Sequence, residues 1–158
     1  MPRLPCVGRD LFEKRAENAI LDGGSLSKLL ADYKSKVDFL FVYLTEAHPR
    51  DGFKMGRNFS FMKQHRSIED RIQCARELIS KDGDTFTSDL RSEDKVRVVV
   101  DTMENDFNET FCAHPDRAYI VENGKMAYIG ATMIETLKTP QVLTTDHLRD
   151  WLESRFQY

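Results

Sequence analysis

The sequence of 158 residues lacks the features that mark membrane-spanning, secreted and nucleic-acid-binding chains. No apolar run approaches the roughly 18 residues that a membrane span needs, and the opening MPRLPCVGRDLFEKR has no apolar core of a signal peptide. Positive and negative side chains are mixed and sum to a net charge of only −3, so no nucleic-acid partner is expected. The chain as it stands predicts a soluble, cytoplasmic protein.

Cysteine is also scarce, and the three that occur, Cys6, Cys74 and Cys112, are spaced neither as a CxxC redox pair nor as a zinc knuckle. We therefore expect neither a disulfide framework nor a metal site. An apolar content of 41% is enough for a real core. Residues 1–158 are expected to form one domain, in which residues 1–24 are an extension or insertion.

Hydrophobic periodicity sets the expected order of elements as helix, strand, helix, strand, hairpin, helix. Strand 37–44 is a continuous apolar run, typical of a strand buried on both faces of a parallel sheet. Asn123-Gly124 is the dipeptide of a type I′ turn, and the polar stretch 82–95 predicts an exposed loop. The expected helices cover 25–34, 67–80 and 146–156, the strands 37–44 and 96–100, and the hairpin 118–130; residues 9–21 are compatible with a further helix.

This order is that of an α/β, thioredoxin-like fold, with the additional strand of its peroxiredoxin-like branch: a mixed central sheet flanked by helices. The strand that opens such a fold, before its first helix, has no counterpart here, so the first strand is expected to be missing. In open α/β sheets, ligands bind beyond the carboxyl ends of parallel strands. Glu46 and His48, just after strand 37–44, are candidates for proton transfer there; the alternative is a solvated Glu46 and a strand-capping His48.

Four segments together resemble the iodothyronine deiodinases: VDFLFVYLTEAHPRDGF, KQHRSIEDR, VVVDTMEN and DRAYIVENGKMAYIG. The resemblance covers residues 37–130 well and the last helix in general character. It implies a thioredoxin-like oxidoreductase that removes iodine reductively from thyroid hormones with a selenocysteine, in a Gly-Ser-x-Thr-Sec-Pro-Pro-Phe motif before the first helix. This sequence lacks that motif. Because the selenocysteine codon is usually read as a stop, the nucleophile is expected upstream of Met1.

The resemblance also implies roles for individual residues. Glu46 and His48 would form the proton relay, with the pKa of His48 raised by the carboxylate, while His65 and Arg117 would hold the iodothyronine. The alternatives are a salt bridge from Arg117 to Asp116 or Glu46, and a His65 that merely sits in a loop. The resemblance implies no bound cofactor, a thiol reductant as co-substrate, a small iodinated aromatic substrate, a homodimer, and a membrane anchor N-terminal to this sequence.

Two other functions stay open. A thiol oxidoreductase could use Cys6, because a thiolate at the start of a helix is stabilised by the helix dipole. A catalytically inactive homologue could bind the ligand without turnover. Among the other residues, Asp101 is expected to be a turn residue or a helix cap. The side chains of Tyr43, Tyr119 and Tyr128 are expected to lie in the core, and the thiol of Cys74 is expected to be buried. Pro115 lies where thioredoxin-like folds often place a cis proline.

Overall fold

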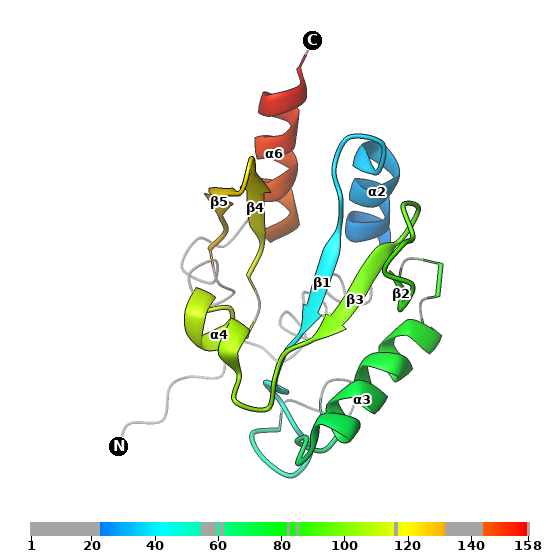
Figure 1. Ribbon diagram of the computed structural model, residues 1–158, viewed down its shortest axis with the longest axis vertical. Coiled ribbons are helices and arrows are strands. Elements are labelled where there is room, and N and C mark those ends of the chain that lie inside the picture. The colour runs from blue at the N-terminus through cyan, green and yellow to red at the C-terminus, as the bar shows by residue number, and fades with distance from the viewer. Residues whose placement is uncertain are drawn as a thin grey trace.

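The computed structural model describes residues 23–54, 60, 62–81, 83–84, 86–115, 117–131 and 144–157, with the side chains of 23–27 and 144–147 left aside. Cys6, Asp116 and the segment 9–21 lie outside the described residues. The elements, drawn in Figure 1, are α2 (Gly23–Tyr33), β1 (Leu40–Tyr43), α3 (Ile68–Lys81), β2 (Phe86–Thr87), β3 (Val96–Val100), α4 (Asp106–Phe111), β4 (Tyr119–Glu122), β5 (Lys125–Ile129) and α6 (Thr144–Phe156).

The centre of the fold is a parallel sheet of β1, β3 and β2, in the order β1-β3-β2. Tyr43 pairs with Val100 at the last position of both β1 and β3, so the carboxyl ends of the two strands lie level. A parallel pair needs a crossover, and α3 lies in the connection between β1 and β3 and packs on β3. The α/β class with helices flanking a parallel sheet is therefore confirmed.

The hairpin of β4 and β5 turns as its sequence predicts. Asn123 and Gly124 have φ values of 53° and 72°, the two positive angles of a type I′ turn. In the part of the chain that the structure describes, however, the hairpin is a two-stranded sheet of its own. Figure 1 shows β4 running beside β1 without joining it. The prediction of one mixed central sheet is thus wrong for these residues, because no ladder of hydrogen bonds connects the free edge of β1 to β4.

Two local predictions also need correction. Strand β1 is not buried on both faces: Leu40 is 57% and Phe41 36% exposed, since among the described strands β1 has a neighbour on one edge only. The segment 82–95 is not wholly an exposed loop, because it contains the short strand β2. Phe86 of β2 is 6% exposed and packs edge-on against Phe41, with 5.5 Å between ring centroids.

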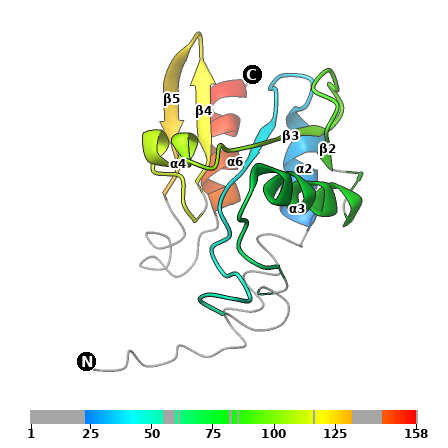
Figure 2. The same ribbon diagram turned by 60° about the horizontal axis from the view of Figure 1, so that its bottom comes forward.

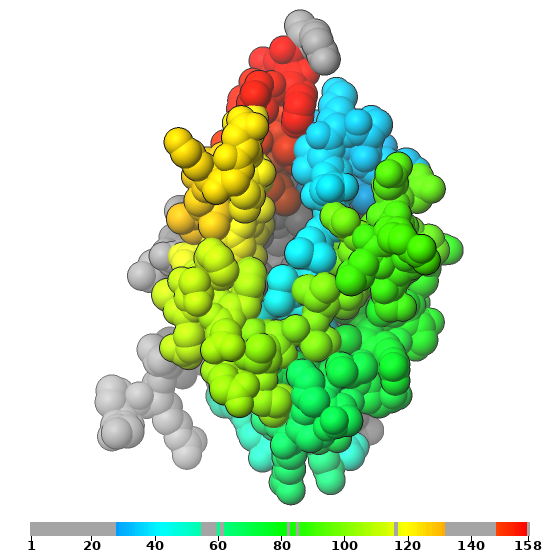
Figure 3. Space-filling view, viewed as in Figure 1, coloured from blue at the N-terminus to red at the C-terminus, as the bar shows by residue number. Residues whose placement is uncertain are grey.

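The core has two parts. The first joins α2, α3 and the sheet and buries Leu30, Ala75, Phe86, Val96 and Val98. The second joins α2 to α6 around Leu29, Tyr33 and Leu152, with Leu148, Trp151 and Phe156 partly buried beside them. Figure 2 shows α3 lying across the sheet and α6 behind the hairpin. In the space-filling view, a furrow separates the hairpin and α4 from β1 (Figure 3).

Candidate functional site

Glu46 and His65 meet beyond the carboxyl end of β1. Glu46 follows β1 by three residues, and His65 lies in the loop that leads into α3. The Nε2 atom of His65 is 3.6 Å from Oε1 of Glu46. The His65 side chain is fully buried, whereas that of Glu46 is 20% exposed. The pair is therefore a carboxylate at the surface with an imidazole directly behind it, and neither a fully solvated Glu46 nor an idle loop histidine describes it.

Tyr43 belongs to the same cluster, although its sequence context predicts a plain core residue. Its hydroxyl donates a hydrogen bond to Oε1 of Glu46, and its ring lies 5.7 Å from that of His65. Burial, followed by the hydrogen bond and charge of Glu46, raises the pKa of Tyr43. The phenol therefore stays protonated and serves as a constant donor to the carboxylate.

Gln64 clamps the two loops of the site together. Its Oε1 accepts hydrogen bonds from the Thr45 hydroxyl and from the backbone N–H groups of Glu46 and His65, each at 3.2 Å. Its Nε2 donates to the carbonyl of Glu46 at 3.0 Å, and its own N–H donates to Asp51 at 2.8 Å. One amide side chain thus holds the backbone of Glu46 from both its donor and its acceptor side.

Arg71, on α3, supports the cluster from inside. It is 2% exposed, and its Nε donates to Nδ1 of His65 at 3.2 Å. Its other nitrogens donate to the carbonyls of Asp101 and Thr102 and to Oδ1 of Asn105. The sequence offered a signal that was missed: an arginine three residues after Ile68 and four before Ala75 falls on the apolar face of α3.

Among the described residues, His48 forms no ion pair with Glu46, whose partner is His65. The ring of His48 lies 5.4 Å from that of Phe53, and among the described residues its buried Nδ1 has no hydrogen-bond partner. Burial lowers the pKa of His48, and the nearby His114 adds to this, against smaller upward effects of the Phe53 backbone and Glu46. The predicted upward shift was wrong, because desolvation outweighs the carboxylate.

The pKa of His65 is lowered as well. Burial is the main cause; Glu46 opposes it and the positive charge of Arg71 adds to it. Because both shifts are downward from an ordinary value of 6.5, His48 and His65 are neutral imidazoles at neutral pH. The site therefore presents one carboxylate and two uncharged rings.

Arg117 lies where the hairpin meets α4. Its Nε donates to the carbonyl of Gly130 at 2.9 Å and its Nη1 to that of Cys112 at 3.4 Å. The peptide bond between His114 and Pro115, just before it, is cis. The structure thus places His65 in the Glu46 cluster and Arg117 at the base of the hairpin.

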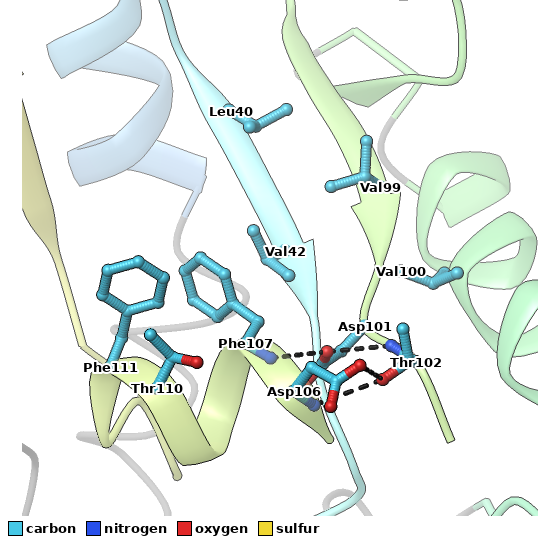
Figure 4. A pocket seen from close by; sticks show the side chains of 10 residues that line it. All are labelled: Leu40, Val42, Val99, Val100, Asp101, Thr102, Asp106, Phe107, Thr110 and Phe111. Carbon is cyan, nitrogen blue, oxygen red and sulfur yellow. Dashed lines mark hydrogen bonds between the residues drawn. The ribbon is translucent and has the colours of Figure 1, made fainter. Parts of the chain in front are cut away.

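Asp101 has the structural role that its sequence predicts. It is 3% exposed, and its carboxylate accepts hydrogen bonds from the backbone N–H groups of Thr102, Phe107 and Asn108 at 2.8, 2.9 and 3.1 Å. Figure 4 shows the bond from Phe107, which joins the end of β3 to the start of α4, and beside it the bond from Thr102. They also hold α4 beside an open, mainly apolar cavity of about 430 Å³, whose walls include Leu40, Val42, Val99, Phe107 and Phe111.

Comparison with known proteins supplies the family. The model of the iodothyronine deiodinase family matches residues 22–156, which include all four segments of the resemblance. The chain belongs to the iodothyronine deiodinase family. It is 33% identical over 135 residues to the type II iodothyronine deiodinase of Bos taurus, covering 84% of this chain and 45% of that protein. It is 32% identical over 129 residues to the thyroxine 5-deiodinase of Ovis aries, covering 82% and 38%.

The human thyroxine 5-deiodinase gives a similar picture, with 31% identity over 129 residues that cover 82% of this chain and 37% of the human protein. The chain therefore spans less than half the length of the curated deiodinases that it matches. Membership of the deiodinase family implies a thioredoxin-like fold, and the parallel sheet flanked by helices agrees with that fold.

Other features bear on what this deiodinase homologue contains. Cys74 is only partly buried, where a buried thiol was predicted, and burial followed by Glu46 raises the pKa of its thiol to about 11. A thiol of that pKa is a poor nucleophile at neutral pH. In the part of the chain that the structure describes, no group of three His, Cys, Asp or Glu side chains could hold a metal ion. No helix in that part is long and apolar enough to cross a membrane.

Proposed function

We propose that this chain provides the proton-handling and substrate-facing part of a deiodinase-like oxidoreductase. The reaction is reductive removal of iodine from a thyroid-hormone-type iodinated aromatic. A selenolate attacks the iodine, the carbon–iodine bond breaks, and the ring carbon takes up a proton, which leaves a selenenyl iodide. Two thiols of a reductant then return the selenol and release iodide, a proton and a disulfide.

The observation that carries the proposal is the Glu46 cluster. A carboxylate that relays a proton to a substrate must reach the surface and yet be held in place, and Glu46 meets both needs, with 20% of its side chain exposed and Tyr43 and His65 against it. Its position beyond the carboxyl end of β1 is the usual ligand site of a parallel sheet. His48 is the second member of the proposed proton relay, because it follows the same strand.

The nucleophile of the proposal is a selenocysteine encoded upstream of Met1. The high pKa of Cys74 supports an outside nucleophile, because that thiol is almost entirely protonated at neutral pH. The alternative nucleophile, Cys6, lies outside the described residues and rests on its sequence position alone. Arg117 would bind the carboxylate of the hormone, since its guanidinium lies at the surface between α4 and the hairpin. Homodimerisation remains a prediction.

The first test is to sequence the transcript upstream of the Met1 codon for an in-frame UGA with Gly-Ser-x-Thr before it and Pro-Pro-Phe after it. The longer reading frame, with cysteine or selenocysteine at that codon, is then assayed for iodide release from an iodothyronine with dithiothreitol. Glu46→Gln should lower kcat at least about a hundredfold with little change in KM. Glu93→Gln, in an exposed loop, is the matched control and should leave both constants unchanged.

The outcomes separate the three functions. Iodide release that depends on Glu46 supports the proposal, whereas release that survives Glu46→Gln removes its central group. A genuine stop codon together with a reactive Cys6 thiol would favour the thiol oxidoreductase. Hormone binding without iodide release from the longer chain would indicate an inactive homologue.

A further inference from the structure

We infer that Arg71 is a positioning residue that holds His65 in one neutral tautomer, with its single proton on Nε2 and directed at Glu46. The Nε–H of Arg71 points at Nδ1 of His65 over 3.2 Å, inside the protein. A guanidinium is always protonated and has only donors, so the nitrogen that faces it must offer a lone pair. Nδ1 of His65 is then unprotonated, and the proton of the neutral ring lies on Nε2.

The position of the guanidinium is itself fixed by the chain. Its Nη1 donates to the carbonyls of Asp101, at 3.2 Å, and Thr102, and its Nη2 donates to Oδ1 of Asn105 at 3.0 Å. Because the five N–H groups of a guanidinium lie in one plane, these bonds also set the direction of the Nε–H. The turn after β3 thus determines the tautomer of a histidine in the loop before α3.

The charges around His65 favour the same neutral state. Glu46, from the loop after β1, and Asp70, from α3, attract a positive charge on the ring. Burial and the charge of Arg71 oppose it, and the atoms that accept hydrogen bonds from Arg71 among the described residues all belong to neutral groups. Tyr43 and Cys74, two further ionisable groups beside the pair, are uncharged, because burial raises the pKa of each.

This arrangement changes the part that His65 can play. If His65 gave its Nε2 proton to Glu46, the ring could be protonated again from its other side only at Nδ1. That nitrogen already accepts the hydrogen bond from Arg71. His65 therefore faces Oε1 of Glu46 with a fixed N–H at 3.6 Å, a contact longer than a hydrogen bond, and does not shuttle protons. Glu46 must recover its proton from the solvent side. This consequence rests on the proposed function, whereas the tautomer itself does not.

The test uses the full chain with ¹⁵N-labelled histidine, and long-range ¹H–¹⁵N spectra between about pH 5.5 and 8.5. His65→Gln identifies the signals of His65 among the four histidines. We expect a pyrrole-like Nε2 and a pyridine-like Nδ1 at the alkaline end of this range, together with a coupling across the hydrogen bond from Arg71 Nε. A protonated Nδ1 or averaged shifts at that end, or a titration with a midpoint at or above the ordinary 6.5, would overturn the inference.

Variants then test whether Arg71 is the cause. Arg71→Met removes the donor, and we expect mixed tautomers and a His65 titration midpoint about one pH unit higher, since a like charge is lost. Arg71→Lys should restore part of the neutral state. Arg76→Gln, on the exposed side of α3, should change nothing. An unmixed Nε2–H state in Arg71→Met refutes the role; if that variant does not fold, the coupling in the unmodified chain decides.

The spectra need no substrate, so the two proposals can fail separately. A chain with the expected tautomer but without iodide release in its longer form would keep the inference and lose the proposed function. An active enzyme whose His65 carries its proton on Nδ1 would do the reverse.

Discussion

Gln64 should contribute more stability than any other polar side chain of the site loops, and Gln64→Ala tests this. The substitution removes three hydrogen bonds to Oε1 and one from Nε2. At about 1 kcal/mol net for each bond, the loss is about 4 kcal/mol. The alanine variant avoids about 1.5 kcal/mol of lost side-chain entropy. The expected decrease in the free energy of unfolding is therefore about 2.5 kcal/mol.

Urea denaturation at pH 7, followed by circular dichroism and by the fluorescence of Trp151, the single tryptophan, measures this decrease. With a denaturant slope of about 2 kcal/mol per M, the midpoint should fall by about 1.2 M. Gln73→Ala, the same substitution at an exposed position of α3, is the control and should stay within about 0.5 kcal/mol of the unmodified chain. A decrease below that value for Gln64→Ala would refute the clamp.

Three further predictions concern pH, thiol chemistry and the hairpin. Because the pKa of His65 is lowered, the histidine contributes its full stability above about pH 6.5. Below that pH its contribution falls by up to about 1.4 kcal/mol per pH unit until the pH reaches the folded-state pKa. In urea denaturation at a series of pH values below 6.5, His65→Gln should make the free energy of unfolding depend less on pH, and an unchanged slope contradicts this. The reactivity of Cys74 can be measured at pH 8 in a variant that carries Cys6→Ser and Cys112→Ser. Iodoacetamide should modify Cys74 about a hundredfold more slowly in the folded than in the unfolded chain, because the pKa of its thiol rises from 9.0 to about 11 on folding. Equal rates would show an accessible thiolate. Gly124→Ala, at φ 72° with open space around it, should cost about 1 kcal/mol and lower Tm by about 2–4 °C in a thermal melt; no change would mean that the turn tolerates a Cβ.

The elements with strong local signals could be predicted from the sequence. The helix expected at 67–80 is α3, and one bond of the expected capping box forms, with the N–H of Asp70 donating to the Ser67 hydroxyl at 3.2 Å, while the Asp70 carboxylate accepts from the N–H of Arg66 at 3.0 Å. The strand expected at 96–100 has the bounds of β3. The type I′ hairpin follows from one dipeptide. In each case a few neighbouring residues determine the conformation, so pattern alone is sufficient.

The elements that were missed depend on contacts with distant parts of the chain. Strand β2 is two residues long and exists through its pairing with β3 and the burial of Phe86. Helix α4 has six residues, and its start is held by Asp101 from the end of β3. Neither is long enough to show a period in the sequence.

The candidate site divides in the same way. Position after a strand was enough to select Glu46, and the family resemblance selected His65, but the pairing of Glu46 with His65 in place of His48 needed the fold. Gln64 and Arg71 act through side-chain contacts that sequence spacing does not encode, across 18 residues to Glu46 and 34 to Asn105. The position of an arginine on the apolar face of α3 is the signal that could have revealed the role of Arg71.

The two histidines of the site differ in what holds them, and this assigns them different chemistry within the proposed function. Both nitrogens of His65 face fixed groups, Arg71 on one side and Glu46 on the other, so its ring can neither turn nor exchange its proton freely. His48 has an unpartnered Nδ1 among the described residues, and its ring lies 5.4 Å from the ring of Phe53, a residue that is 71% exposed. A ring with an unpartnered nitrogen beside an exposed aromatic can still respond to a ligand by taking or giving a proton. In the proposed enzyme, His65 is therefore a fixed neighbour of Glu46, and any histidine chemistry on an aromatic substrate falls to His48.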